Sequence, residues 1–168
     1  MNLAQLNSAH GIPGHVAFVA GKNNLTRVDL SLGTATAQVY LLGATLTSFK
    51  DCTGKELIWL RYVLLVFESP HFKSSEADND VISDTAIFAP GKAIRGGVPI
   101  CWPQFGPGTL QQHGFARNSE FAVHKTDHTE SKGTQLIIPI SAALLSDMLT
   151  NCAYFPSNSV YSVETIRK

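Results

Sequence analysis

The stretch TRVDLSLGTATAQVYLLGATLTSF, residues 26–49, decides the fold class. Apolar side chains occupy every second position from Val28 to Leu32, and polar side chains stand between them. This period of two predicts a β-strand with one buried face. Residues 37–49 predict two more strand-like pieces, and Gly43 predicts a bend or bulge between them.

Short strand-like segments continue along the rest of the chain. They are rich in β-branched and aromatic residues, are separated by Gly, Pro, Asn and Asp, and cover residues 56–60, 86–88, 98–102, 120–124 and 134–140. Strands at this spacing favour an all-β fold, an antiparallel β-sandwich, over alternating βαβ units. One helix is predicted, at 141–150, where Ser141 can act as the N-cap before an apolar stripe.

Length and charge limit the classes of function. A length of 168 residues fits a single domain, taken as residues 1–168. Thirteen basic and thirteen acidic residues cancel, which argues against nucleic acid or an anionic membrane as a partner. Three well-separated cysteines and an N-terminus without the pattern of a secretory signal favour the cytoplasm, with a plastid as the alternative.

Residues 61–84 fit the strand pattern poorly. An apolar burst at 62–67 is followed by a polar stretch that contains five of the thirteen acidic residues of the chain. Long loops with such a composition are uncommon inside compact domains and are functional or disordered where they occur. The sequence therefore predicts an inserted, mobile loop at 61–84.

The stretch RGGVPICWPQFGPGTLQQHGFARN, residues 95–118, holds the candidate site. Its polar side chains of interest are Arg95, Gln112, His113 and Arg117. Guanidinium, amide and imidazole groups together are suited to hold hydroxyls and phosphates. Glycines after Arg95 and after His113 permit backbone turns that other residues avoid, and such turns could make these side chains converge.

Plainer interpretations of the same residues stay open at this point. Arg95 could be a solvated charge on a hairpin, and His113 could be a structural histidine. The aromatic residues Trp102 and Phe105 could offer apolar faces to a sugar ring or could belong to the core, and the core is favoured for Trp102.

The stretch from His124 to His128 could also be taken for a metal site. On a strand these two histidines share a face, but Asp127 would point away and a third ligand is not evident. The sequence therefore predicts no metal site here.

The motif RGGVPICWPQFGPG followed by QQHGFARN resembles the aldose 1-epimerase superfamily, in particular its glucose-6-phosphate 1-epimerase branch of hexose-6-phosphate mutarotases. The upstream stretches VYLLGATLTSFK and GKELIWL fit the same family in order and spacing. The resemblance runs from about Val16 to about Ile140 and corresponds to the N-terminal portion of the family. It implies a large β-sandwich, a cofactor-free interconversion of the α and β anomers of glucose 6-phosphate, and a hexose 6-phosphate as the partner.

Individual site residues follow from the resemblance. Arg95, Gln112 and Arg117 match positions that the family uses as sugar-phosphate ligands. His113 matches a histidine that lines the pocket and hydrogen-bonds the sugar, and it is the one candidate catalytic residue in the chain. Two guanidiniums can bracket a phosphate dianion, which agrees with the chemistry of these groups.

The chain departs from the family pattern in its last third. The general acid of the family is a histidine well downstream of QHGFAR and the general base is a glutamate further on, but no histidine follows His128 here. Residues 141–168 therefore count as a divergent tail. We expect a truncated member of the family, weakly active or inactive alone, that is prone to self-association through open strand edges.

Other classes of function remain as alternatives. A non-catalytic sugar-phosphate-binding β-sandwich module would keep Arg95, Gln112 and Arg117 without the acid and base. A neutral-sugar mutarotase or lectin-like sandwich would have little use for paired arginines, and a purely structural β-domain would not explain why the motif pieces occur together.

Overall fold

The computed structural model describes residues 1–58 and 86–139. The predicted loop at 61–84, the predicted helix at 141–150 and the divergent tail at 141–168 lie outside the described residues. Within the described ranges, no helix is long and apolar enough to cross a membrane.

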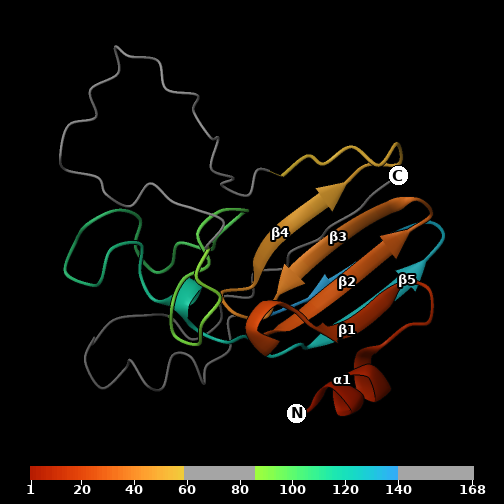
Figure 1. Cartoon of the computed structure of the whole chain (residues 1–168), viewed down its shortest axis with the longest axis horizontal. Coiled ribbons are helices and arrows are strands. Elements are labelled where there is room, and N and C mark those ends of the chain that lie inside the picture. Colours follow the sequence, from red (N-terminus) through yellow and green to blue (C-terminus); the bar gives the residue numbers. More distant parts are fainter. Residues whose placement is uncertain (59–85, 140–168) are drawn as a thin grey trace.

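A four-stranded antiparallel sheet forms the first layer of the fold (Figure 1). Its spatial order follows the chain: β1 (Val16–Ala20), β2 (Thr26–Leu32), β3 (Ala35–Tyr40) and β4 (Thr45–Lys50). Val28 pairs with Val39 and Leu30 pairs with Ala37, so that the buried positions of neighbouring strands stand side by side. The period of two in the sequence therefore predicted this part of the sheet correctly.

The bend predicted at Gly43 is confirmed. Residues 41–44 turn the chain from β3 into β4, with a φ of +68° at Gly43 and +45° at Ala44. This conformation belongs to the left-handed region that glycine adopts without steric penalty.

A hairpin of β5 (Lys125–Thr129) and β6 (Gly133–Ile137) lies behind the four-stranded sheet in Figure 1. The Thr134 hydroxyl in β6 donates to the Ser31 carbonyl in β2 at 2.8 Å and ties the two layers together. The core between them is apolar and includes Phe18, Val28, Leu30, Val39, Phe121, Leu136 and Ile138. This arrangement is the antiparallel β-sandwich that the sequence predicted.

Three predictions of local structure were wrong. Segments 86–88, 98–102 and 120–124 form no strands, and the bridges of the last two are isolated ones at Val98, Trp102 and Glu120. Glycine and proline residues break the ladder at the first two segments, at Pro90, Gly97 and Pro99, so these residues form connecting segments instead.

Elements that the sequence did not predict are also present. Helix α1 (Leu3–His10) has a capping box between Asn2 and Gln5 but buries only Leu6, so its apolar pattern is weak. Strand β5 has the sequence KTDHT, whose largely polar pattern carries no alternation of apolar residues. Short 3₁₀ turns occupy η1 (Lys22–Asn24) and η2 (Ala116–Asn118).

Glu56 fastens the residues after β4 to that strand. Its carboxylate accepts from the Ser48 hydroxyl and from the backbone N–H groups of Phe49 and Ile58. Partial desolvation works to raise the pKa of Glu56, but these hydrogen bonds outweigh it and hold the pKa below its ordinary value.

We expect residues 56–58 to detach from β4 at low pH. Because the folded pKa of Glu56 is lowered, its contribution is present above the ordinary carboxylate pKa and is lost as the pH falls through the folded pKa. We expect the amide signals of Phe49 and Ile58 to shift together on acidification in NMR spectra. Glu56→Gln should abolish this transition, and an unchanged transition in that variant would contradict the assignment to Glu56.

Candidate functional site

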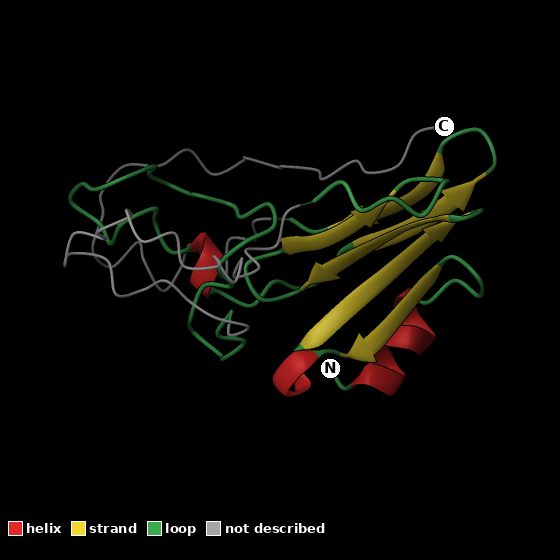
Figure 2. Ribbon diagram, turned by 45° about the horizontal axis from the view of Figure 1, so that its top comes forward, coloured by secondary structure: helices red, strands yellow, loops and turns green. Residues whose placement is uncertain are grey.

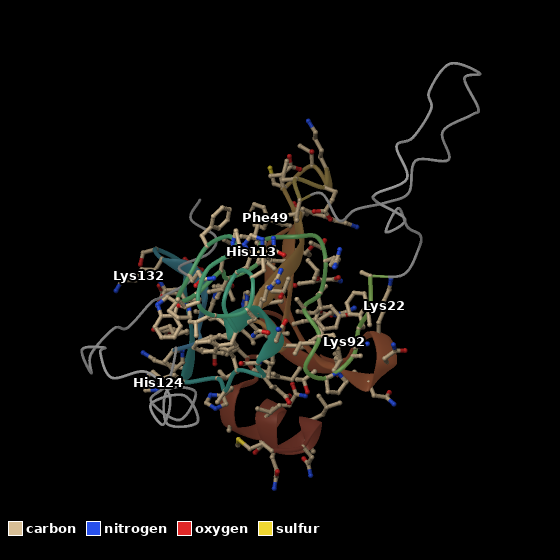
Figure 3. The ribbon with its side chains drawn as sticks, turned by 90° about the vertical axis from the view of Figure 1, so that its left-hand side faces the viewer. Lys22, Phe49, Lys92, His113, His124 and Lys132 are labelled. Carbon is tan, nitrogen blue, oxygen red and sulfur yellow. The ribbon has the colours of Figure 1, made fainter. Side chains whose placement is uncertain are left out.

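The loops between residues 94 and 119 gather at one end of the sheet, beyond the start of β4 (Figures 1 and 2). Figure 3 looks onto this end and shows His113 near the middle of the view, while His124 and Lys132 lie toward its edge. The candidate residues all belong to these loops, so their placement depends on how each loop is attached to the sheet.

The segment that carries Arg95 is attached to β4. Ile94 is buried, and the Val98 N–H donates to the Leu46 carbonyl at 2.9 Å. Gly97 has a φ of +67°, and a Cβ there would lie 2.1 Å from the Leu46 carbonyl oxygen. Arg95 itself is exposed. The exposed Arg95 side chain thus projects from a backbone segment that is held against β4, as the glycines in the motif predicted.

The segment that carries Gln112, His113 and Arg117 is attached at two places. The N–H groups of Phe115 and Ala116 both donate to the Trp102 carbonyl, at 3.1 and 3.2 Å. Trp102 is half-buried against the core and meets the Phe115 ring edge-on at 5.3 Å, in agreement with the core interpretation of this tryptophan.

The second attachment joins this segment to the bend between β3 and β4. The Gly43 N–H donates to the Ser119 carbonyl at 2.7 Å, and the Phe121 N–H donates to the Leu41 carbonyl at 2.9 Å. A Cβ at Gly43 would lie 2.6 Å from the Arg117 carbonyl oxygen, so only glycine permits this close approach.

Gln112 and His113 lie in a turn, not in an extended segment. The Gly114 N–H donates to the Gln111 carbonyl at 2.9 Å, and both His113 and Gly114 have positive φ values, +66° and +70°. The kink that the sequence assigned to Gly114 therefore begins one residue earlier, at His113. A non-glycine residue in this region of φ is uncommon and is found preferentially at functional sites.

Arg117 and Gln112 are in direct contact. Nη2 of the half-buried Arg117 donates to the Gln112 backbone carbonyl at 2.7 Å, while the Gln112 side chain is exposed. The Arg117 Nε atom is buried without a hydrogen-bond partner in the described part of the chain. Two of the three predicted ligands are thus neighbours, and the use of Arg95 in the same site stays a prediction.

The sequence interpretation missed the importance of Gln104 and Gly106. Both lie in the loop that joins Trp102 to Gln112, and they hydrogen-bond each other and their neighbours. The motif PQFGPG contains both residues, but nothing in the sequence indicates that a glutamine between Pro103 and Phe105 turns its side chain into the loop.

The histidines that could have suggested a metal site have other contacts. The His128 ring stacks on His15 at 3.4 Å between centroids, and its Nδ1 hydrogen-bonds the Thr134 hydroxyl at 3.0 Å. His124 is exposed. His128 therefore belongs to the contact between the two sheets.

Comparison with known proteins places these features in a family. The family model for aldose 1-epimerase matches residues 27–140. That range contains strands β2, β3 and β4 of the four-stranded sheet, apart from Thr26, together with the candidate-site loops and the β5–β6 hairpin. It does not contain β1.

Relatives of known sequence carry the same name, "Putative glucose-6-phosphate 1-epimerase". The protein from Cenchrus ciliaris is 43% identical over 88 residues, which cover 52% of this chain and 20% of the relative. The protein from Escherichia coli is 34% identical over 132 residues, which cover 75% of this chain and 37% of the relative.

Two crystal structures share the fold. HI1317 has a TM-score of 0.59 and 26% identity, and the match covers 79% of this chain and 41% of that one. The Salmonella typhimurium protein YeaD, described as a "putative mutarotase", has a TM-score of 0.63 and 24% identity, with 91% and 45% covered. The chain spans less than half the length of each of these relatives. On the family match, this chain belongs to the aldose 1-epimerase family.

Proposed function

We propose that this chain provides the sugar-phosphate-binding part of a glucose-6-phosphate 1-epimerase, an isomerase that interconverts the α and β anomers. The observation that supports it most is the contact between Arg117 and the carbonyl of Gln112, directly beside His113. Family membership supports the reaction class, and the names of the relatives support glucose 6-phosphate as the substrate.

The proposed ligands would bind different parts of the substrate. Arg95 and Arg117 would bind the phosphate, since guanidinium groups make charge-assisted hydrogen bonds to phosphate oxygens. One Arg117 nitrogen is already held by Gln112, which limits the orientations that its guanidinium can adopt. The Gln112 amide and the His113 ring would hydrogen-bond hydroxyls of the sugar.

The proposed reaction needs a proton acceptor and a proton donor. A base takes the proton of the anomeric hydroxyl while an acid protonates the ring oxygen, so the bond from C1 to the ring oxygen breaks. Rotation about the C1–C2 bond and closure from the other face then invert the anomeric centre. Each positioned group contributes about 10²- to 10⁴-fold in rate. Because neither family group is identified among residues 1–168, we expect this chain alone to be weakly active or inactive.

Titration with glucose 6-phosphate tests the binding proposal. We expect a micromolar affinity for glucose 6-phosphate and an affinity for glucose that is weaker by roughly 100-fold, because the phosphate contacts contribute on the order of 3 kcal/mol. Arg95→Gln should weaken glucose 6-phosphate binding about tenfold or more and leave glucose binding unchanged. Calorimetry or NMR titration would measure these affinities.

Lys132→Gln serves as the matched control. Lys132 is an exposed cation of the β5–β6 turn, at the edge of the view in Figure 3, and its removal changes the net charge by the same amount. Equal affinities for glucose and glucose 6-phosphate, or equal effects of both substitutions, would contradict the proposed phosphate site. An anomer exchange rate well above that of buffer, measured by NMR saturation transfer, would show that residues 1–168 contain the catalytic groups.

A further inference from the structure

The loop from residue 104 to residue 113 is organised around one side chain, that of Gln104. Its Nε2 donates to the carbonyls of Gly106 at 3.1 Å and Leu110 at 3.3 Å. Its Oε1 accepts from the Leu110 N–H, also at 3.3 Å. One half-buried amide therefore closes the loop by bonding to both sides of it.

Gly106 connects Gln104 to His113. The Gly106 carbonyl, which accepts from Gln104, also accepts from the His113 N–H at 3.0 Å. The Gly106 N–H donates to Nδ1 of the His113 ring at 3.1 Å. Because Nδ1 is the acceptor in this bond, the neutral ring carries its proton on Nε2.

The orientation of the His113 ring is fixed from a second direction. The Phe105 ring lies edge-on to it, with 5.0 Å between centroids and an angle of 66° between planes. Phe105 is 81% exposed, so it packs on His113 and not on the core. The ring of His113 is thus held by its Nδ1 hydrogen bond and by an aromatic neighbour of the same loop.

We infer that Gln104 is a positioning residue, which sets the orientation and the tautomer of His113 through Gly106 and so presents Nε2–H as a hydrogen-bond donor. The inference rests on the proposed function for one point only, namely that this donor meets a hydroxyl of the sugar. The hydrogen bonds from Gln104 to Gly106 and from Gly106 to His113 are properties of the loop itself.

A scalar coupling between two nitrogen nuclei tests the inference directly. In ¹⁵N-labelled protein, the hydrogen bond from the Gly106 N–H to Nδ1 of His113 should produce a coupling between these nitrogens. Gln104→Leu should abolish it, because the Gly106 carbonyl then loses one of its two donors and the loop loses the Gln104 bonds to Leu110 that close it. Affinity for glucose 6-phosphate should fall about tenfold, the equivalent of one well-made hydrogen bond.

A second variant, Gly108→Ala, moves the Gln104 amide away while Gln104 itself is kept. A Cβ at Gly108 would lie 2.3 Å from the Oε1 atom of Gln104, which is the end of a flexible side chain and can move away. Gly108→Ala should therefore remove the same coupling in a protein that is otherwise folded, as judged by its amide spectrum. Thr109→Ala is the matched control, since Thr109 is exposed in the same loop, and it should keep the coupling.

The possible results distinguish the positioning role of Gln104 from the proposed binding of glucose 6-phosphate. Loss of the coupling in Gln104→Leu and in Gly108→Ala, with the coupling intact in Thr109→Ala, supports the positioning role. A coupling that persists in both variants, or is missing from the unaltered protein, overturns it. If the unaltered protein shows the coupling but does not bind glucose 6-phosphate, the proposed function fails while the positioning of His113 stands.

Discussion

Gly114→Ala is expected to lower the free energy of unfolding by about 4 kcal/mol. The φ of Gly114 is +70°, a conformation that costs an alanine roughly 1–2 kcal/mol. In addition, the new Cβ would lie 2.1 Å from the Trp102 carbonyl oxygen and 2.8 Å from the Pro103 nitrogen. These are backbone atoms, so the two segments would have to separate and break the hydrogen bonds from Phe115 and Ala116 to Trp102.

Urea denaturation of Gly114→Ala beside Gly91→Ala would separate the two contributions. Gly91 has a nearly equal φ of +73°, but a Cβ there would meet no atom within 4 Å. Its substitution should therefore cost only the conformational part, about 1 kcal/mol. Equal losses in the two variants would mean that segments 102–103 and 114–116 are not in contact.

Thr134→Val is expected to destabilise the protein by about 2 kcal/mol. Thr134 is completely buried, and its hydroxyl hydrogen is donated to the Ser31 carbonyl. The bond with His128 must therefore be donated by Nδ1 of the ring, which would lose its acceptor in the variant. Valine has nearly the same shape, so no cavity forms, and the loss reports the hydrogen bond to Ser31 in the other sheet together with the hydrogen bond to His128 within the hairpin.

The matched substitution is Thr36→Val in β3. Thr36 is only partly buried, and its hydroxyl makes no hydrogen bond to the described part of the chain, so the change should stay within about 0.5 kcal/mol. Denaturation curves of both variants give the comparison. A Thr134→Val protein as stable as Thr36→Val would show that the hydrogen bonds of Thr134 to Ser31 and His128 contribute nothing to stability.

The sequence predicted β2, β3 and β4 but missed β1 and β5. Alternation from Val28 to Leu32 and the glycine at position 43 were sufficient to place β2, β3 and β4. Strand β5 was missed because its pairing with β6 depends on backbone hydrogen bonds and not on apolar side chains. Apolar segments such as 98–102 were assigned as strands because periodicity alone cannot distinguish a short strand from an apolar connecting segment.

The sequence singled out a set of candidate residues but gave no geometry for them. The motif pointed to Gln112, His113 and Arg117, and the fold brings Gln112 and Arg117 into contact. That contact uses a backbone carbonyl, which no pattern of side chains can reveal. The role of Gln104 was equally hidden, since it depends on which way an amide turns inside a loop.

The bend from β3 into β4 has a consequence for the two loops that carry Arg95 and Arg117. Gly43 anchors the segment that carries Arg117, and Leu46 anchors the segment that carries Arg95. These anchors are only three positions apart in the chain, and three residues of extended chain reach at most about 10 Å. The two loops therefore cannot move apart without the loss of one of these anchors, so the turn between β3 and β4 couples their positions.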